Sequence, residues 1–367
     1  MQNLPAHLER ILNLARWAPS GDNTQPWRFK ILGDEHILVQ GFDTRDHVVY
    51  DLDGHASQLA IGGLLETIVI AATGEGRSTS VKRRTETPDT HLLFDVQFQQ
   101  QTDFRPSTLL PYIEARVVQR RPMHTKSLSV EQKQALEKSL PDGYSVIWID
   151  RFLQRFKMAK LLFSSAKIRL TIPEAYAAHK SAIEWGAKFS ANRIPSRAIG
   201  VDPVTECLMR WVMASWERVR FFNTYLFGHF APRLQLDFVP GVLCAAHFTL
   251  TAPKPLGTID DFVAAGRVMQ RFWLSASQLG WLIQPEMTPL IFARFHRQEL
   301  VFSQIHLAQL QAKSINSRLQ GITGAETIEK VYLLGRIGAG PMPSARSTRK
   351  ALADLVTLSA PLSSLES

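Results

Sequence analysis

The sequence predicts an α+β or mixed α/β protein whose helices flank one or two sheets, and two observations lead to this fold class. Short apolar segments typical of buried strands alternate with longer segments of helical periodicity. Two of the helical segments also resemble each other, which indicates two related halves. The 367 residues are 45% hydrophobic and 20% charged, a globular composition in a chain long enough for two units.

The first half is predicted from a helix, a strand pair and a second helix. Apolar residues recur at helical spacing over residues 4–15, and Pro19 ends that pattern. Residues 29–39 are typical of two strands joined by a turn at Gly33-Asp34. Residues 54–73 are apolar on nearly all sides, which predicts a central, buried helix.

The internal similarity lies in two helical segments. Residues 261–280 resemble residues 54–73 when Gly62 is aligned with Gly266. Three further pairs then agree, namely Glu66 with Gln270, Ala72 with Ala276 and Gly76 with Gly280. Because Gly in a helix costs about 1 kcal/mol relative to Ala, the matched glycines suggest that two helix backbones pack closely. Duplication accounts for the agreement, and coincidence between two apolar helices is the alternative.

The second half carries an additional helical stretch. Segments that end at Pro19 and Pro141 precede the paired helices, and their spacing leaves an excess in the second half at about 150–240. The excess contains helical patterns rich in Trp, Met and Phe, which fit either a cap over a site or ordinary core helices. We therefore predict a first half over 1–115 and a second half over 116–367 with an insertion.

Two strands complete the second half, and several kinds of site are excluded. Residues 241–250 predict a buried strand before the second central helix, and residues 331–340 predict a strand that enters a Gly-Pro-rich turn. The sequence has no P-loop, HExxH, GxGxxG or GxSxG motif. Cys207 and Cys244 are too few for a disulfide scaffold or a four-cysteine zinc site, so we predict no metal and two buried thiols.

Charge and hydropathy bear on the partners and the location of the protein. The formal net charge is +9, but no basic helix or aromatic platform accompanies it, so nucleic-acid binding ranks last. No uninterrupted apolar run reaches the length of a membrane span, and the N-terminus lacks the apolar region of a signal peptide. These features predict a soluble cytoplasmic protein without a membrane partner.

Three segments have a composition suited to ligand binding. Residues 18–27, APSGDNTQPW, combine small residues with the amides of Asn23 and Gln25, which suit a flat heterocycle; an ordinary helix-to-strand turn is the alternative. Residues 116–124, RVVQRRPMH, offer guanidinium groups that could bind phosphate. A solvated basic turn is the alternative interpretation of this segment. Residues 341–350 place Arg346 and Arg349 after a Pro-rich loop, or form a basic tail.

Together these segments resemble the nitroreductase superfamily of FMN-dependent flavoproteins. The family motif A-P-S-x-x-N-x-Q-P-W is complete in residues 18–27. The segment 116–124 resembles the family's R-R-S-x-R element, with Pro122 in place of Ser and His124 in place of the last basic residue. Residues 279–287 resemble the end of the family's central helix and the proline that follows it. The resemblance covers most of the chain outside about 150–240.

The order of these motifs implies a single-chain pseudo-dimer. Ordinary family members dimerise, and each flavin lies between a basic element from one subunit and a P-S-x-x-N loop from the other. Here the loop lies in the first half and Arg120-Arg121 lies in the second. Each half retains what the other lacks, which is similar to the internally duplicated, Acg-type branch. The resemblance therefore implies a nitroreductase-like fold, one FMN site and a monomer.

The resemblance also assigns the cofactor-binding residues. The resemblance implies that Arg120, Arg121 and His124 bind the phosphate and the ribityl or pyrimidine edge of FMN. It also implies that Arg346 reaches the phosphate, with Arg349 as its substitute. The isoalloxazine falls to the loop residues Pro19, Ser20, Gly21, Asn23 and Gln25. Its N5 side falls to Pro285, Glu286 and Met287. No protein acid or base is required by the family's chemistry, so no catalytic residue is named.

Three functions follow from the resemblance. The first is an FMN-dependent oxidoreductase that uses NAD(P)H to reduce nitroaromatic, quinone or similar acceptors. The second is an FMN-sequestering protein whose capped site has little NAD(P)H turnover. The third keeps the flavin but acts on a specialised substrate such as a peptide azoline.

Overall fold

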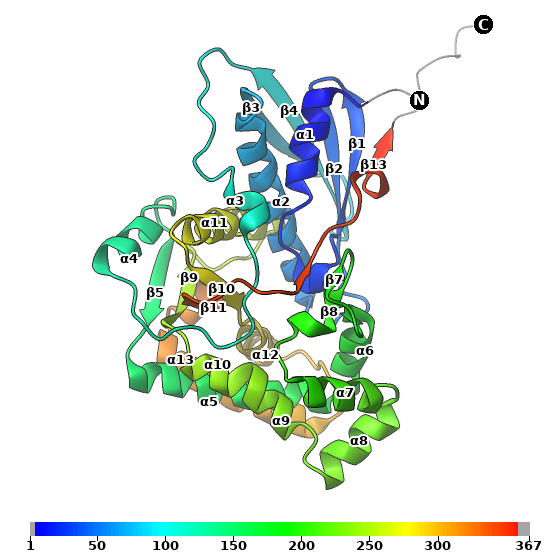
Figure 1. The fold of residues 1–367 in the computed structure, drawn as a ribbon, viewed down its shortest axis with the longest axis vertical. Helices are drawn as coiled ribbons and strands as arrows, with labels where there is room; N and C mark the ends of the chain where they lie inside the picture. The colour runs from blue at the N-terminus through cyan, green and yellow to red at the C-terminus, as the bar shows by residue number, and fades with distance from the viewer. Residues whose placement is uncertain (1–3, 359–367) are drawn as a thin grey trace, which may run out of the picture.

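The computed structural model describes residues 4–358, which form two sheets with helices packed between and around them (Figure 1). The first sheet has the strand order β13-β1-β2-β4-β3. Its strands are β1 (Trp27–Gly33), β2 (His36–Phe42), β3 (Arg77–Arg84), β4 (His91–Gln100) and β13 (Val356–Leu358). All neighbours are antiparallel except β13, which lies parallel to β1 and brings the C-terminal segment back to the first half.

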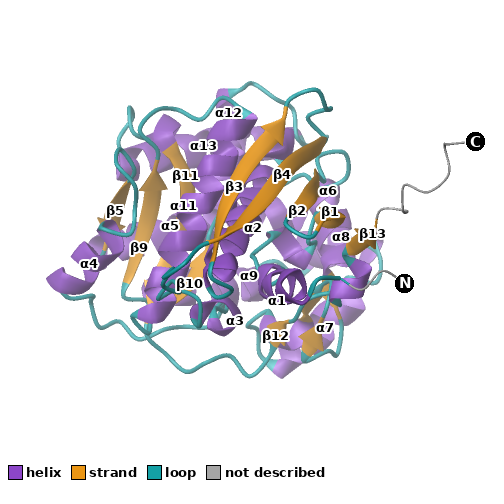
Figure 2. Cartoon of the chain, turned by 90° about the horizontal axis from the view of Figure 1, so that it is seen from above, coloured by secondary structure: helices purple, strands orange, loops and turns teal. Residues whose placement is uncertain are grey.

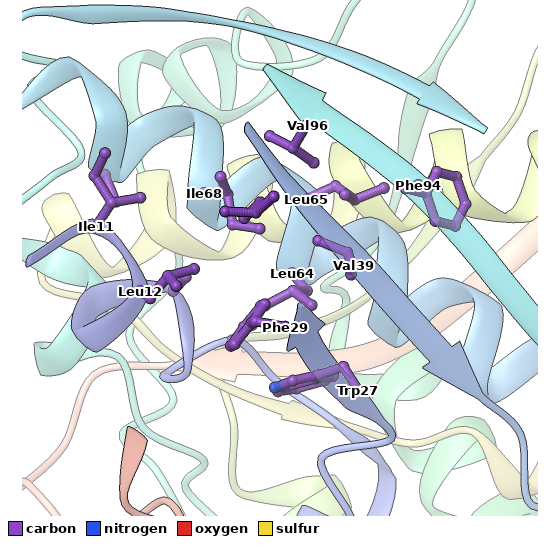
Figure 3. Packing of buried hydrophobic residues seen from close by; sticks show 14 of the residues in the cluster. Ile11, Leu12, Trp27, Phe29, Val39, Leu64, Leu65, Ile68, Phe94 and Val96 are labelled. Atoms are coloured by element: carbon purple, nitrogen blue, oxygen red, sulfur yellow. The ribbon is translucent and has the colours of Figure 1, made fainter. Parts of the chain in front are cut away.

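Two helices cover the first sheet. The amphipathic α1 (Ala6–Ala15) and the long α2 (His55–Thr73) pack on one face, and their side chains meet those of β1, β2 and β4 (Figure 3). Trp27 and Phe29 are fully buried beside Leu64 and Leu65 of α2. The prediction of a central, buried helix at 54–73 is confirmed. By length and composition alone, the helical segment Leu52–Thr73 could cross a membrane. However, 83% of its apolar 18-residue stretch is buried inside the protein, as is usual for a core helix.

The second sheet has the strand order β10-β11-β9-β5 and is antiparallel throughout. Its strands are β5 (Ser145–Ile149), β9 (Ala246–Thr251), β10 (Leu282–Pro285) and β11 (Val331–Gly338). Its helices are α4 (Val130–Glu137), α11 (Ile259–Gln278), α12 (Thr288–Arg297) and α13 (His306–Thr323). A short helix, α3 (Tyr112–Ala115), precedes them.

The two sheets share one connectivity. In chain order the first half runs α1, β1, β2, α2, β3, β4. The second half runs α4, β5, β9, α11, β10, β11, with additional helices between β5 and β9 and with α12 and α13 between β10 and β11. The spatial orders β1-β2-β4-β3 and β5-β9-β11-β10 are then the same. Figure 2 shows α2 and α11 between the two sheets, with β5, β9 and β11 on the left and β1 and β2 on the right.

The contacts between α2 and α11 are reciprocal. A Cβ built on Gly62 would lie 2.0 Å from the carbonyl oxygen of Val263, and one on Gly266 would lie 2.1 Å from that of Leu59. In each case the glycine touches the residue that lies three positions before the other glycine. The predicted close packing of the two helix backbones at Gly62 and Gly266 is therefore confirmed.

Polar contacts beside the glycines follow the same exchange. Arg271 donates to Glu66, and at the matching positions Gln270 Nε2 donates to Thr67 Oγ1 over 3.0 Å. Arg267 Nε donates to the other oxygen of Glu66 over 3.0 Å. Because the same contact occurs with the two helices interchanged, α2 and α11 cross about a local two-fold axis.

Residues between β5 and β9 form a helical layer at the lower end of Figure 1. The layer contains α5 (Phe152–Thr171), α6 (Pro173–Ala182), α7 (Pro203–Val212), α8 (Trp216–Tyr225), α9 (Phe230–Arg233), the π-helix η4 (Leu234–Phe238) and α10 (Val239–Val242). Three short strands interrupt it, β6 (Ile183–Glu184), β7 (Phe189–Ser190) and β8 (Ile194–Pro195). At the corresponding place the first half has only the turn between β1 and β2.

Two expectations need correction. The strand predicted over 241–250 begins only at Ala246, because Val239–Val242 form the last helical turn of the layer and place Pro240 at its start. Cys207 is exposed on α7, whereas Cys244 is buried. None of the side chains of α7 is buried, so Cys207 is exposed even though cysteine is usually a buried residue.

Candidate functional site

A cavity of about 320 Å³ lies where the two halves meet. The first half contributes the loop Pro19–Asn23 and the start of α2, and the second contributes residues 116–120, α11 and β10. The C-terminal segment adds Arg346 and Arg349, and the helical layer adds Ile194. This volume is at the lower end of the range for pockets that enclose a small organic ligand.

The loop that follows α1 has a strained backbone. Asp22, Asn23 and Gln25 all have positive φ, at 50°, 62° and 51°. Non-glycine residues rarely adopt this conformation, and such strain concentrates where a binding site requires it. The hydroxyl oxygen of Ser20 accepts from the Gln25 amide over 3.0 Å and closes the loop.

Two amide side chains fasten this loop to the rest of the site. Asn23 Nδ2 donates to the carbonyls of Arg193 and Thr348 over 3.3 and 3.2 Å. Gln25 Nε2 donates to the carbonyl of Ala191 over 2.8 Å, and its Oε1 accepts from the Lys350 amide over 3.0 Å. The loop is thereby held against both the helical layer and the C-terminal segment.

Three arginines gather at one end of the cavity. Arg116 is 4% exposed, and its Nη2 donates to the carbonyl of Trp17 over 2.9 Å. Arg349 Nη2 donates to the carbonyl of Ala18 over 3.0 Å, and Arg346 Nη2 donates to that of Glu114 over 2.9 Å. The three guanidinium groups take backbone carbonyls as acceptors. Within residues 4–358 none of them forms a salt bridge with a carboxylate.

The electrostatics of this cluster are unfavourable without an anion. Burial lowers the pKa of Arg116 well below its usual value, and the charges of Arg349 and Arg346 lower it further. Burial, with the charges of Arg346 and Arg16, also lowers the pKa of Arg349 to about 9. One buried and two half-buried cations lie close together here, and the nearby Glu114 charge only partly offsets the lowered pKa of Arg346. Such a cluster suits a multiply charged anion such as a phosphate group.

A second polar group lies beside the strained loop. Burial lowers the pKa of Arg120 to about 10, and the nearby carboxyl of Asp22 partly offsets that effect. Burial raises the pKa of Asp22, against the charges of Arg120 and Arg169. Arg120 Nη1 donates to the carbonyl of Ala198 in the helical layer over 3.3 Å. Arg120 therefore connects the loop, the cavity and the layer.

The other end of the cavity is aromatic. The His55 ring stacks on Phe262 with 3.8 Å between ring centroids, and Arg294 Nη1 approaches His55 Nδ1 at 2.8 Å. Burial lowers the pKa of His55 to about 3, so its ring is neutral at neutral pH. Tyr50 O–H lies 3.0 Å from His179 Nε2, and burial also lowers the pKa of His179 to about 3.

Several buried polar atoms around the cavity lack a hydrogen-bond partner in the part of the chain that the structure describes. They are Asn23 Oδ1, Gln284 Oε1, Trp273 Nε1, Tyr332 Oη, Arg116 Nε and Arg346 Nε. Because an unpaired buried polar atom costs free energy, six such atoms around one cavity indicate a polar ligand. The set contains both donors and acceptors, so it suits a heterocycle that carries N–H and C=O groups.

Glu286 has a structural environment outside the cavity lining. Its two oxygens contact His247 Nδ1 at 2.7 Å and Arg336 Nη1 at 2.6 Å, and all three side chains are buried. Burial alone would lower the pKa of His247, but the Glu286 carboxylate raises it to about 10. This group fixes the backbone of Pro285 and Met287, whose side chains do line the cavity.

The structure brings most of the predicted binding residues to one cavity. Its lining includes Pro19, Ser20, Gly21, Asn23, Arg120, Pro285, Met287, Arg346 and Arg349. Gln25, Arg121, His124 and Glu286 are outside it. Arg121 and His124 are exposed, and Gln25 uses its amide on the backbone.

The sequence did not lead us to predict a binding role for Arg116, although Arg116 is the first residue of the candidate segment 116–124. The family element R-R-S-x-R places its outer arginines four residues apart, and Arg116 and Arg120 have this spacing. The prediction instead placed the two adjacent arginines of this element at Arg120-Arg121. Asp22 and Gln284 also line the cavity, and both lie within segments that the sequence singled out. Trp273 and Tyr332 line it as well, and nothing in their local sequence indicated it. Within residues 4–358 no group of three metal-ligating side chains occurs.

Comparison with known proteins identifies one part of the chain. Residues 5–62 match the family model described as the nitroreductase family. No curated protein matches the chain in sequence. The matched residues include the whole strained loop and the first part of α2, both of which line the cavity. The match supports the nitroreductase superfamily, and with it an oxidoreductase whose cofactor is a flavin.

Proposed function

We propose that this protein is an FMN-dependent oxidoreductase that takes electrons from NAD(P)H and passes them to nitroaromatic, quinone or similar acceptors. One observation carries the proposal, namely the buried Arg116 and the half-buried Arg346 and Arg349, which form no salt bridge within residues 4–358, at a cavity whose lining residues include several with unpaired buried polar atoms. A phosphate bound by Arg116, Arg346 and Arg349 would neutralise the cluster. Bound FMN supplies reversible electron transfer that no side chain of the cavity provides.

The chain's own residues bind and orient the cofactor. Arg116 and Arg349 place cations at the phosphate end, and Trp273 Nε1 remains free to donate. Asn23 Oδ1 and Gln284 Oε1 are free to accept N–H groups from a ring. Pro285 at the end of β10 and Met287 just before α12 line the cavity, and the buried Glu286 between them is fixed by His247 and Arg336. The strained loop keeps Asn23 at the cavity.

The two halves act as a pseudo-dimer in this proposal. The shared connectivity of the two sheets and the reciprocal contacts of Gly62 and Gly266 support an internal duplication. In this proposal the protein is a monomer of the Acg-type branch with one FMN site, located in the cytoplasm. It needs no second copy, because the cavity already receives residues from both halves.

FMN sequestration with little NAD(P)H turnover is the second candidate, and a contact of the helical layer favours it. Ile194 lines the cavity, and the carbonyls of Ala191 and Arg193 are bound by Gln25 and Asn23. The layer therefore touches the loop that lies against the ligand. A layer that stays closed would admit FMN during folding but restrict nicotinamide and acceptor afterwards.

A cofactor titration tests the proposed site. The purified chain is stripped of bound ligand and titrated with FMN and with riboflavin, which lacks the phosphate. We expect Arg116→Met to weaken FMN binding roughly 10- to 100-fold and to leave riboflavin binding nearly unchanged. Arg121→Met is the matched control, because Arg121 is exposed outside the cavity. Equal effects of Arg116→Met on both flavins contradict the phosphate assignment.

A reduction experiment distinguishes the two candidate functions. NADPH or NADH is added without oxygen to the flavin-bound chain, and the flavin absorption is followed. Bleaching within seconds to minutes, and its reversal by a quinone or nitroaromatic compound, supports the oxidoreductase. Absorption that persists with both nucleotides while dithionite bleaches it supports sequestration.

A further inference from the structure

A second concave surface lies on the helical layer, away from the central cavity. It is a groove of about 840 Å³ between α5, α13 and the segment formed by α9 and η4. The proposed flavin chemistry does not use it, and none of its lining residues lines the central cavity. It therefore requires a separate explanation.

The floor of the groove is aromatic and well packed. The ring of Phe163 meets that of Phe230 edge-on at 5.7 Å and that of Phe238 at 6.1 Å. The Arg233 guanidinium lies 3.7 Å from the centroid of Phe163 and supports the ring from one side. Phe230 remains 50% exposed although it is part of this cluster. A preformed apolar floor that stays open to solvent suits an apolar occupant.

The rim of the groove is cationic. Lys157 and Lys160 lie three residues apart on the exposed side of α5, and Arg318 reaches the groove from α13. Arg318 Nη1 donates to Ser164 Oγ over 2.8 Å, which positions its charge at the groove wall. None of the groove's lining residues is acidic, and neither α5 nor α13 contains Asp or Glu. Within residues 4–358 these three cations form no salt bridge.

The fourth element of the groove has an unusual backbone. Leu234 and Phe238 are the first and last residues of the π-helix, and both line the groove. Asp237, between them, is turned inward, where its carboxylate accepts from Arg169 over 2.8 Å. π-Helical turns are rare and are frequent at functional sites. Here the turn places two apolar side chains on the groove while it buries the segment's only acidic group.

From these features we propose that the groove binds a long-chain carboxylate, with its hydrocarbon chain on the phenylalanine floor and its carboxylate among Lys157, Lys160 and Arg318. The apolar floor without the cations would fit any hydrophobic surface, and the cations without the floor would fit any anion. Their combination selects a molecule with an apolar chain and one anionic end. The groove lies between α5, α13 and the segment formed by α9 and η4, so the apolar floor and the cations face the same space.

Isothermal titration calorimetry with laurate tests the proposal on the full chain in its flavin-bound form. We expect one saturable site. Dodecyltrimethylammonium has the same chain with a cationic head, and acetate has the carboxylate without the chain. We expect each to bind at least 10-fold more weakly than laurate. Raising the salt concentration should weaken laurate binding, since charge attraction contributes to it.

Two variants and a control locate the site. Lys157→Glu/Lys160→Glu should weaken laurate binding at least 10-fold. Leu234→Asn should also weaken it, because it replaces an apolar side chain that lines the groove. Both substitutions are at partly or fully exposed positions, so the fold is retained. Lys126→Glu/Lys138→Glu makes the same charge change at exposed positions outside the groove and should leave binding unchanged.

Three results would overturn the proposal. Equal affinity for laurate and dodecyltrimethylammonium would show a surface without charge selection. Release of flavin from the protein in proportion to added laurate, measured as free flavin after ultrafiltration, would show that laurate occupies the central cavity. Binding to vesicles of anionic lipid without binding of monomeric laurate would show that the face contacts a membrane. Because calorimetry requires no electron transfer, failure here is distinct from failure of the proposed flavin chemistry.

Discussion

The crossing of α2 and α11 permits a test in which two adjacent glycines should behave oppositely. Gly62 and Gly63 lie in the same helix and are both buried. A Cβ on Gly62 would lie 2.0 Å from the Val263 carbonyl oxygen and 2.9 Å from the Arg267 nitrogen, both of which are backbone atoms. A Cβ on Gly63 would lie 3.5 Å from Pro19 Cγ, an ordinary van der Waals distance.

These distances set the expected magnitudes. Gly62→Ala forces the helices more than 1 Å apart to reach ordinary contact, and overpacking of this kind costs about 1–3 kcal/mol or more. The intrinsic helix preference of Ala returns about 1 kcal/mol in both variants. We therefore expect Gly62→Ala to lower the free energy of unfolding by about 2 kcal/mol and Gly63→Ala to raise it slightly.

Denaturant titration of the purified variants measures the difference. Gly266→Ala should resemble Gly62→Ala, because its Cβ meets the Leu59 carbonyl in the reciprocal contact. The double variant Gly62→Ala/Gly266→Ala should lose less than the sum, since one methyl already separates the helices. If Gly62→Ala proved as stable as Gly63→Ala, the close approach of the two backbones would be refuted.

Three further predictions follow from the site. Arg116→Met should raise the free energy of unfolding of the flavin-free chain by about 1–3 kcal/mol, measured by denaturant titration, because it removes a buried guanidinium that lies close to two other cations; a loss of stability would contradict the proposed anion site. Gln25→Leu should cost about 2 kcal/mol and speed amide exchange at Lys350, because it leaves buried backbone groups unpaired; unchanged exchange at Lys350 would count against it. The raised pKa of His247 should give a stability contribution that is complete below about pH 6.5 and is lost as the pH rises toward about 10, because only the folded chain retains the proton there. The loss should be absent in His247→Gln, and an equal loss in that variant would assign the effect to other groups.

Local patterns predicted the elements that position the site. The helix at 54–73, the turn at Gly33-Asp34 and the matched glycines depend on periodicity and backbone space, which neighbouring residues determine. The motif at 18–27 also predicted a binding loop, and the structure places most of it in the cavity. Even so, its composition did not show that Gln25 would turn away to bind the backbone.

The remainder of the site depends on contacts between distant segments. The sequence shows Arg120-Arg121 as a conspicuous pair, but in the structure Arg120 lines the cavity and Arg121 is exposed to solvent. Arg116 joins Arg346 and Arg349 from more than 200 positions away. No local pattern encodes such a meeting. The strand predicted at 241–250 was too long for a similar reason, because the preceding helical layer determines where the chain can enter the sheet.

The return of the C-terminal segment to the first half determines when the cavity can exist. Arg346 and Arg349 reach it only as the chain runs from β12 (Arg346–Ser347), which pairs with β7, to β13, which pairs with β1. During synthesis strands β1 to β4 of the first sheet can pair long before these residues leave the ribosome. The phosphate end of the cavity is therefore among the last parts of the protein to form. A cofactor cannot guide the folding of the first half in this order, and its capture marks a chain whose two halves have already joined.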